Sequence, residues 1–403
     1  MSLKGNLLVG QSGGPTAVIN ASLAGVVEEA KKHSEIADIY GCVHGVQGLL
    51  KEDIADLGRE KPDTIKGLKT TPSAALGSCR YKLKADDAER LLRVIQAHNV
   101  RHFLYIGGND SAETCHTIAE LALREGYEMR VMGVPKTVDN DLQYTDHCPG
   151  YGSVARFVAV ATMDAGRDTE AIGIVDNVKV IETMGRNAGW ITAAAGLARR
   201  EELEAPHLIY LPEIAFNKDQ FLSDVQNVFG RFGYCVLAVC EGLRDAEGKE
   251  LAASGSTIDT DAFGHKQLGG VGDLLCDLIA TNLKIKARCD KPGTIQRMSS
   301  LIASSVDIEE AYMVGQAAVR AAAEGTSGQM VTLVRESDDP YSCTTGLVPL
   351  EKVAAGEKKV PREFVTPEGN FVSQAFLDYV RPLVGSLPKY ARLELHRVAK
   401  RLS

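Results

Sequence analysis

The sequence predicts an α/β protein with two Rossmann-like domains, each a parallel sheet covered by helices, and an active site in the cleft between them. Three observations support this prediction. Apolar runs of strand length alternate with longer runs of helical periodicity. Glycine-rich turns follow several of these apolar runs, and charged side chains stand at those turns. Alternating strands and helices favour a parallel sheet, and such sheets bind ligands beyond the carboxyl ends of their strands.

The first series of elements occupies the first third of the chain. We expect strands at residues 6–10, 101–106 and 130–134, with helices at 17–31 and 112–125 between them. A helix at 151–163 follows the third of these strands.

A second series begins at a strand over residues 177–182. A helix at 189–199 and strands at 207–211 and 234–240 continue it. We expect residues 345–361 to form a loop with short turns, and residues 389–403 to form a basic amphipathic tail that is a docked or solvated helix. The predicted domains are residues 1–142 with 296–350, and residues 143–295 with 351–403 and its accessory segment.

Composition limits the class of protein. A chain of 403 residues is long enough for two or three domains, and no apolar run approaches the length of a membrane span. The first residues lack the pattern of a secretory signal, and the nine cysteines lie singly, as in a cytoplasmic protein with reduced thiols. A net charge of -8 argues against a nucleic-acid surface but leaves small anionic ligands open.

The most informative segment is Pro135-Lys136-Thr137-Val138-Asp139-Asn140-Asp141, which ends an apolar run. In an extended segment, residues two apart face the same side, so Asp139 and Asp141 can point into one cleft with Lys136 nearby. A base, a second acid that holds a metal or a hydroxyl, and a cation are the groups that phosphate chemistry needs. The alternative is a solvated loop that carries a helix cap.

Two glycine turns also stand at strand ends. Gly13 and Gly14 precede a helix expected from Ala17, whose free N–H groups can bind a phosphate. Gly108 precedes Asp110, which can hold Mg²⁺ against phosphate oxygens. The alternative for Gly13 and Gly14 is an ordinary tight turn, and the alternative for Asp110 is a helix cap.

Several arginines follow glycine turns and can bind phosphates through their planar guanidinium groups. The alternative, which is commoner for any single arginine, is an ordinary surface side chain. They are Arg80, Arg186, Arg288 and Arg297, and Glu241 marks a further strand end.

Six motifs together resemble those of the phosphofructokinase family, in that family's order over residues 6–325. They are Ser12-Gly13-Gly14, Leu76-Gly77-Ser78-x-Arg80, Gly107-Gly108-x-Asp110-Ser111, Thr137-Val138-Asp139-Asn140-Asp141, Met184-Gly185-Arg186 and Gly293-x-Ile295-Gln296-Arg297.

The resemblance implies a role for each matched residue. Asp139 is expected to take the proton from the sugar 1-hydroxyl and Asp141 to orient that hydroxyl, while Thr137 and Arg80 contact the transferred phosphoryl group. The residues expected to bind the donor are Gly13, Gly14, Gly108, Asp110 and Lys136, with Mg²⁺ at Asp110. Those expected to bind fructose 6-phosphate are Met184, Gly185, Arg186, Glu241, Arg288 and Arg297.

Two departures within these motifs resemble the pyrophosphate-dependent members of the family. ATP-using relatives have glycine where this chain has Asp110 and Lys136. A carboxylate at position 110 would repel the α-phosphate of a nucleotide, whereas Lys136 would neutralise the outer phosphate of pyrophosphate. Val46 also offers less stacking surface than the tyrosine that borders the nucleotide in ATP-using relatives.

Three other departures qualify the match. Asn109 stands where a metal-associated aspartate is usual, and Thr294 replaces a histidine that binds the sugar phosphate. An arginine that a neighbouring subunit supplies in relatives is replaced near Asn177, where Lys179 is a candidate substitute.

We therefore expect a cytoplasmic, Mg²⁺-dependent homo-oligomer, a dimer or tetramer, that transfers a phosphoryl group reversibly between pyrophosphate and fructose 6-phosphate. The alternatives are an ATP-dependent phosphofructokinase and a noncatalytic subunit of the same fold that binds sugar phosphate. A nicotinamide-binding oxidoreductase is disfavoured because the glycine fingerprint is missing.

Overall fold

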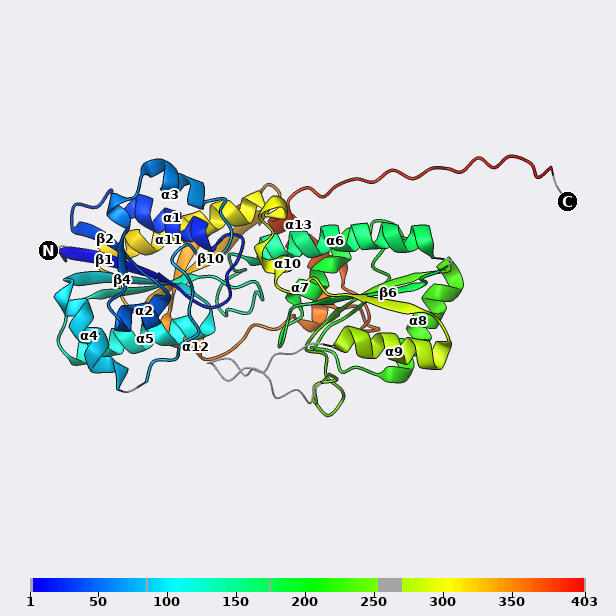
Figure 1. Ribbon diagram of the computed structural model, residues 1–403, viewed down its shortest axis with the longest axis horizontal. Coiled ribbons are helices and arrows are strands. Elements are labelled where there is room, and N and C mark those ends of the chain that lie inside the picture. The colour runs from blue at the N-terminus through cyan, green and yellow to red at the C-terminus, as the bar shows by residue number, and fades with distance from the viewer. Residues whose placement is uncertain (1–2, 85, 174, 253–269, 402–403) are drawn as a thin grey trace.

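The computed structural model describes residues 3–84, 86–173, 175–252 and 270–401. Figure 1 shows two α/β halves side by side along the long axis, each with a sheet between helices. The predicted fold class is therefore confirmed. The domain boundaries given above stay a prediction.

The first half contains a seven-stranded sheet in the order β11-β10-β5-β4-β1-β2-β3. Its five inner strands are parallel, and β3 and β11 pair antiparallel at the two edges. The last two strands in the chain thus extend a sheet that the first residues begin. The bounds are β1 Gly5–Gln11, β2 Ile36–Cys42, β3 Ile54–Asp56, β4 Val100–Gly107, β5 Arg130–Pro135, β10 Gln329–Asp338 and β11 Tyr341–Pro349.

Helices cover both faces of this sheet and bury two apolar layers. On one face, α1 and α11 approach so closely that a Cβ atom on Gly25 would lie 2.2 Å from the carbonyl oxygen of Tyr312. Only glycine fits this contact. The helices of this face are α1 Ile19–Ala30, α3 Pro62–Leu68 and α11 Ser305–Ala323; those of the other face are α2 Gly45–Leu50, α4 Asp87–Ala97, α5 Asn109–Arg124 and α12 Leu350–Ala354.

The second half has a four-stranded parallel sheet in the order β7-β8-β6-β9. Two further apolar clusters flank it, one with α6 and α13, the other with α8 and α9. The bounds are β6 Val178–Thr183, β7 Leu208–Tyr210, β8 Cys235–Cys240, β9 Ala287–Asp290, α6 Tyr151–Ile172, α7 Trp190–Ala193, α8 Lys218–Phe232, α9 Val271–Leu283, α10 Ile295–Met298 and α13 Gln374–Val384.

Two predictions for the C-terminal part were wrong. Residues 345–361 are not a loop, because they contain most of β11 and the whole of α12. The tail is not a helix: residues 386–401 are extended, and residues 402–403 lie outside the described residues. Arginines hold the tail's carbonyl groups, which a helix would need for itself. Arg156 donates to the oxygen of Ser386 at 2.6 Å, and Arg167 to that of Ala391 at 3.4 Å.

All nine cysteines are free, and six of them are buried, as the sequence predicted for reduced thiols. Among the described residues, no helix is both long and apolar enough to cross a membrane.

Candidate active site

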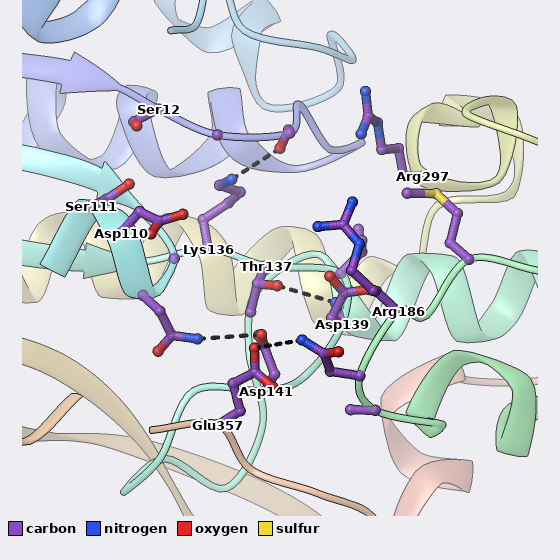
Figure 2. Close-up of a pocket in the computed structure, with 18 of the residues that line it drawn as sticks. Ser12, Asp110, Ser111, Lys136, Thr137, Asp139, Asp141, Arg186, Arg297 and Glu357 are labelled. Atoms are coloured by element: carbon purple, nitrogen blue, oxygen red, sulfur yellow. Dashed lines mark hydrogen bonds between the residues drawn. The ribbon is translucent and has the colours of Figure 1, made fainter. Parts of the chain in front are cut away.

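A cavity of about 250 Å³ lies between the two halves, and strand ends from both sheets line it. It contains every predicted site residue except Gly185 and Arg288. Figure 2 shows the carboxylates of Asp139 and Asp141 in the middle of this cavity. The lining residues are Ser12, Gly13, Gly14, Arg80, Gly108, Asn109, Asp110, Ser111, Lys136, Thr137, Val138, Asp139, Asp141, Met184, Arg186, Asn187, Ala188, Glu241, Arg297 and Glu357.

The turn after β1 forms one end of the cavity. Gly13 has a φ of 76°, a conformation that favours glycine, and Ser78 donates a hydrogen bond to its carbonyl oxygen at 2.5 Å. A Cβ atom on Gly14 would lie 2.8 Å from a guanidinium nitrogen of Arg297, so glycine lets that arginine approach.

The helix after this turn differs from the prediction. It begins at Ile19, not near Ala17, because the Thr16 hydroxyl accepts hydrogen bonds from the N–H groups of Val18 and Ile19 at 3.3 and 3.0 Å. These N–H groups are therefore not available to a phosphate, and Ala17 N–H already donates to the carbonyl of Arg297 at 2.8 Å. The Gly13 N–H is also engaged, since it donates to the carbonyl oxygen of Cys79 at 3.2 Å.

The turn after β4 places Asp110 in the first turn of α5, where it lines the cavity near Lys136 (Figure 2). The turn is tight, since a Cβ atom on Gly107 would lie 1.9 Å from the Ser111 hydroxyl oxygen. The amide of Asn109 donates to Asp141 at 3.3 Å. This contact links the start of α5 to the aspartate motif.

The side chain of Lys136 is buried, and its ammonium group donates to the carbonyl oxygen of Gly14 at 2.9 Å. Lys136 thus lies between the aspartate motif and the first glycine turn, as Figure 2 shows. Burial, assisted by the nearby positive charge of Arg297, lowers the pKa of Lys136 to about 8.

Asp139 and Asp141 are held by the backbone of their own loop. The Thr137 hydroxyl accepts a hydrogen bond from the Asp139 N–H at 3.1 Å. Asn140 adopts a φ of 54°, and its amide group donates to the Tyr379 hydroxyl at 3.0 Å. This left-handed residue between the two aspartates directs both carboxylates into the cavity.

The environment of the two aspartates disfavours their charged forms. Burial, together with the negative charges of Asp141 and Glu241, raises the pKa of Asp139 to about 7, although Arg186 and Lys136 oppose the shift. Burial also raises the pKa of Asp141. Asp139 is therefore a carboxylate that gains and loses a proton near neutral pH.

The second half contributes the ends of β6 and β8. Gly185 has a φ of 131°, and its N–H donates to a carboxylate oxygen of Glu241 at 3.4 Å. A Cβ atom on Gly242 would lie 1.8 Å from the carbonyl oxygen of Arg186, so these two turns touch. The contact sets Arg186 opposite Asp139 (Figure 2).

Two arginines of the cavity have capacity for a ligand. Within the described part of the chain, the buried Nε atoms of Arg186 and Arg297 have no hydrogen-bond partner. A buried donor without an acceptor is costly unless a ligand supplies one, and guanidinium groups suit phosphate oxygens.

The structure does not bring Arg288 to this cavity. Arg288 lies on β9, is largely exposed, and forms an ion pair with Asp176 at 2.7 Å. Lys179, the candidate substitute for the missing arginine, pairs with Asp290 at 3.0 Å on the same side of the molecule. Both lie outside the cavity lining.

Sequence reasoning missed several residues that line the cavity, above all Asn187 and Glu357. Glu357 belongs to the segment that was expected to be accessory. No local pattern marks it, because long-range packing brings it to the cleft. Asn187 follows Arg186 directly, so its place in the same turn was a signal that could have found it.

Comparison with known proteins agrees with this geometry. The phosphofructokinase family pattern matches residues 6–322. This chain belongs to the phosphofructokinase family. It is 44% identical over 414 residues to the pyrophosphate–fructose 6-phosphate 1-phosphotransferase of Xanthomonas campestris, covering 99% of this chain and 98% of the relative.

Two further relatives are similar over the whole chain. The enzyme of the same name from Halomonas elongata is 41% identical over 98% of both chains. The crystal structure of pyrophosphate-dependent phosphofructokinase from Nitrosospira multiformis superposes with a TM-score of 0.87 at 41% identity, covering 99% of each chain.

Proposed function

We propose that this member of the phosphofructokinase family transfers a phosphoryl group reversibly between pyrophosphate and the 1-hydroxyl of fructose 6-phosphate. One observation carries the proposal: Lys136, Asp139 and Arg186 follow one another across a single cavity. A phosphate-holding cation, a base and a second anion-binding group are thus arranged in the order that this transfer needs. The full-length relatives named for the same reaction support it.

Asp139 is the proposed base. Its pKa of about 7 suits the removal of a proton near neutral pH and its return in the reverse direction. Asp141, two residues on, orients the hydroxyl. Thr137 and Arg80 contact the transferred group, whose charge spreads over its equatorial oxygens in the transition state.

The first half of the cavity is the proposed donor side. Gly13, Gly14 and Gly108 leave room for the phosphate oxygens, and Lys136 neutralises the outer phosphate. Asp110 disfavours the α-phosphate of a nucleotide through like-charge repulsion. The proposed donor domain is built on the seven-stranded sheet.

The second half is the proposed sugar side. Met184 and Glu241 border the sugar, and Gly185 holds the Glu241 carboxylate through its N–H. Arg186 and Arg297 bind the 6-phosphate as bidentate donors. Arg288 points away from the cavity of its own chain. Its predicted contact with a 6-phosphate therefore needs the cavity of a second copy, which fits the expected homo-oligomer.

The residues present also fit Mg²⁺. In the described part of the chain, the buried oxygens Asn109 Oδ1 and Asp141 Oδ1 have no partner, and Asp110 lines the same side of the cavity. No cluster of three or more His, Cys, Asp or Glu side chains among the described residues could hold a metal. Mg²⁺ commonly takes few protein carboxylates and completes its shell with phosphate oxygens and water. When bound, it would neutralise the phosphate charge.

This reaction exchanges one phosphate linkage for another of similar energy, so we place it near equilibrium, in the cytoplasm, serving both glycolysis and gluconeogenesis.

A side-by-side assay tests the proposal. Purified protein is given fructose 6-phosphate, Mg²⁺ and either pyrophosphate or ATP, and formation of fructose 1,6-bisphosphate is followed. We expect turnover with pyrophosphate and the reverse reaction with phosphate. Faster turnover with ATP would contradict the proposal, and no turnover with either donor would favour a noncatalytic subunit.

A further inference from the structure

A short segment near the C-terminus touches both halves of the cavity at once. We call residues 357–360 the brace. On the side of the first half, Glu357 forms an antiparallel bridge with Leu142, and Lys358 N–H donates to the carbonyl oxygen of Asp141 at 2.7 Å. The Lys358 ammonium group donates to the carbonyl oxygen of Asp146 at 2.8 Å. The backbone of the aspartate motif is therefore tied to the brace.

On the side of the second half, the brace binds the turn that carries Arg186. The amide of Asn187 donates to Glu357 Oε1 at 3.0 Å, and the Lys359 ammonium group donates to the carbonyl oxygen of Asn187. Trp190, which begins α7, donates its ring N–H to the carbonyl oxygen of Lys358 at 3.0 Å. Both ends of this turn are thus held by the same short segment.

Glu213 completes this attachment. One of its carboxylate oxygens accepts the N–H groups of Val360 at 3.0 Å and of Gly189 at 2.9 Å. The end of the brace and the end of the turn consequently share one acceptor, so displacement of either disturbs the other.

Glu357 is the residue of the brace whose side chain reaches the cavity. Figure 2 shows it next to Asp141, and Lys359 lies 3.3 Å from its second carboxylate oxygen. Its negative charge also contributes to the raised pKa of Asp141. One side chain therefore contacts the turn of Arg186 and acts electrostatically on Asp141.

We propose that Glu357 is a positioning residue for the sugar phosphate, because it fixes the Arg186 turn relative to Asp139 and Asp141. This inference rests on the proposed function, in which these groups bind and deprotonate fructose 6-phosphate. The Glu357 side chain acts through the hydrogen bond that it accepts from Asn187, while its backbone is anchored beside the aspartate motif by the bridge to Leu142. Its loss lets the two sides of the sugar site move apart while the donor side keeps its contacts.

The kinetic test compares Glu357→Gln and Glu357→Ala with Glu368→Gln, which alters an exposed glutamate of the same C-terminal segment outside the cavity lining. Loss of a hydrogen bond to a charged group predicts roughly a tenfold higher KM for fructose 6-phosphate in Glu357→Ala. We expect a smaller rise of this KM in Glu357→Gln. The KM for pyrophosphate should stay within about twofold of wild type in all three variants, because none of them disturbs the donor side.

A second measurement does not depend on turnover. Hydrogen exchange of the amides in segments 139–146 and 184–189 is expected to accelerate in Glu357→Ala and not in Glu368→Gln.

Equal rises in KM for both substrates would overturn the proposal, as would faster exchange without any change in the KM for fructose 6-phosphate. Exchange that accelerates over the whole chain would also overturn it, since that describes general destabilisation. If the wild-type protein does not turn over pyrophosphate, the proposed function fails. Hydrogen exchange in segments 139–146 and 184–189 still tests whether Glu357 holds these two segments in place.

Discussion

The two walls of the cavity hold anions by different means. The wall from the seven-stranded sheet is mostly backbone and short side chains, with one buried cation, Lys136, fixed to the Gly14 carbonyl. Two long guanidinium groups also extend into the cavity: Arg186 comes from the opposite side, and Arg297 lies between the two sides, against Gly14. Within the described residues their Nε atoms have no partner. We call these two groups the guanidinium wall. The first wall, which we call the rigid wall, has its buried cation held by the backbone, whereas the guanidinium wall has donors left for a ligand.

This difference matches the two proposed substrates. Pyrophosphate is small and uniform, so a fixed cradle with one charge suffices to hold it. A sugar phosphate has its phosphate far from its reacting hydroxyl. The planar guanidinium group of arginine, carried on a long side chain, can bind such a distant phosphate. Substitutions on the two walls should therefore change different kinetic constants.

The largest effect is expected at Asp139, which lies between the walls. Asp139→Asn removes the base but keeps the shape, and kcat should fall about 10³-fold, within the usual contribution of a general base. Binding of fructose 6-phosphate, measured by calorimetry, should persist because both walls are intact. A kcat within tenfold of wild type would assign the proton to another group.

The next largest effect is expected on the rigid wall. Lys136→Met removes its buried charge, and kcat/KM for pyrophosphate should fall about 100-fold, as for loss of one preorganised electrostatic contact. The KM for fructose 6-phosphate should change little. Comparable losses for both substrates would mean that the walls are not independent.

A smaller effect is expected on the guanidinium wall. Arg297→Ala should raise the KM for fructose 6-phosphate roughly tenfold, because a charge-assisted hydrogen bond is lost. The kcat measured at saturating fructose 6-phosphate with pyrophosphate as donor should be nearly that of wild type. Steady-state kinetics with each substrate varied in turn measures this difference.

Arg288→Ala tests whether this wall extends into a second copy. Assayed alone, Arg288→Ala should raise the KM for fructose 6-phosphate to a similar extent as Arg297→Ala. Mixing it with inactive Asp139→Asn, after unfolding and refolding the two together, should restore activity, because one mixed site then contains both an intact Asp139 and an intact Arg288. Activity that is merely the sum of the two separate proteins would place each site within a single chain.

The smallest effect concerns pH. Asp139 acts as a base only when ionised, above its pKa of about 7, and Lys136 holds a phosphate best when protonated, below its pKa of about 8. The rate kcat/KM should therefore rise with pH through 7 and fall above 8. In Lys136→Met the fall above 8 should disappear. The acidic limb should remain and move to higher pH, because the charge of Lys136 lowers the pKa of Asp139.

The sequence predicted the parallel strands and the two glycine turns because apolar runs and their glycines are local signals. It misjudged features that depend on distant partners. Most of β11 was taken for a loop because Tyr341–Pro349 has no long apolar run and lies at a sheet edge, paired with β10. The helix α1 starts at Ile19, whose N–H donates to the Thr16 hydroxyl. The tail stays extended because arginines such as Arg156 bind its carbonyl oxygens.

The candidate site follows the same rule. Residues at strand ends, such as Asp110 and Asp139, were predicted because parallel strands bring their carboxyl ends together. Glu357 was missed because more than two hundred residues separate it from the aspartate motif that it contacts. Arg288 shows the converse, since its motif is near that of Arg297 in the chain but faces another direction.

The order of strands in the seven-stranded sheet also bears on synthesis of the chain. β5 pairs with β10, whose residues leave the ribosome almost two hundred positions later. Until then the β5 edge has open N–H and C=O groups, which invite pairing with other chains. The second sheet can close before the first one does. The rigid wall, although it starts at the N-terminus, is thus among the last parts of the molecule to be completed.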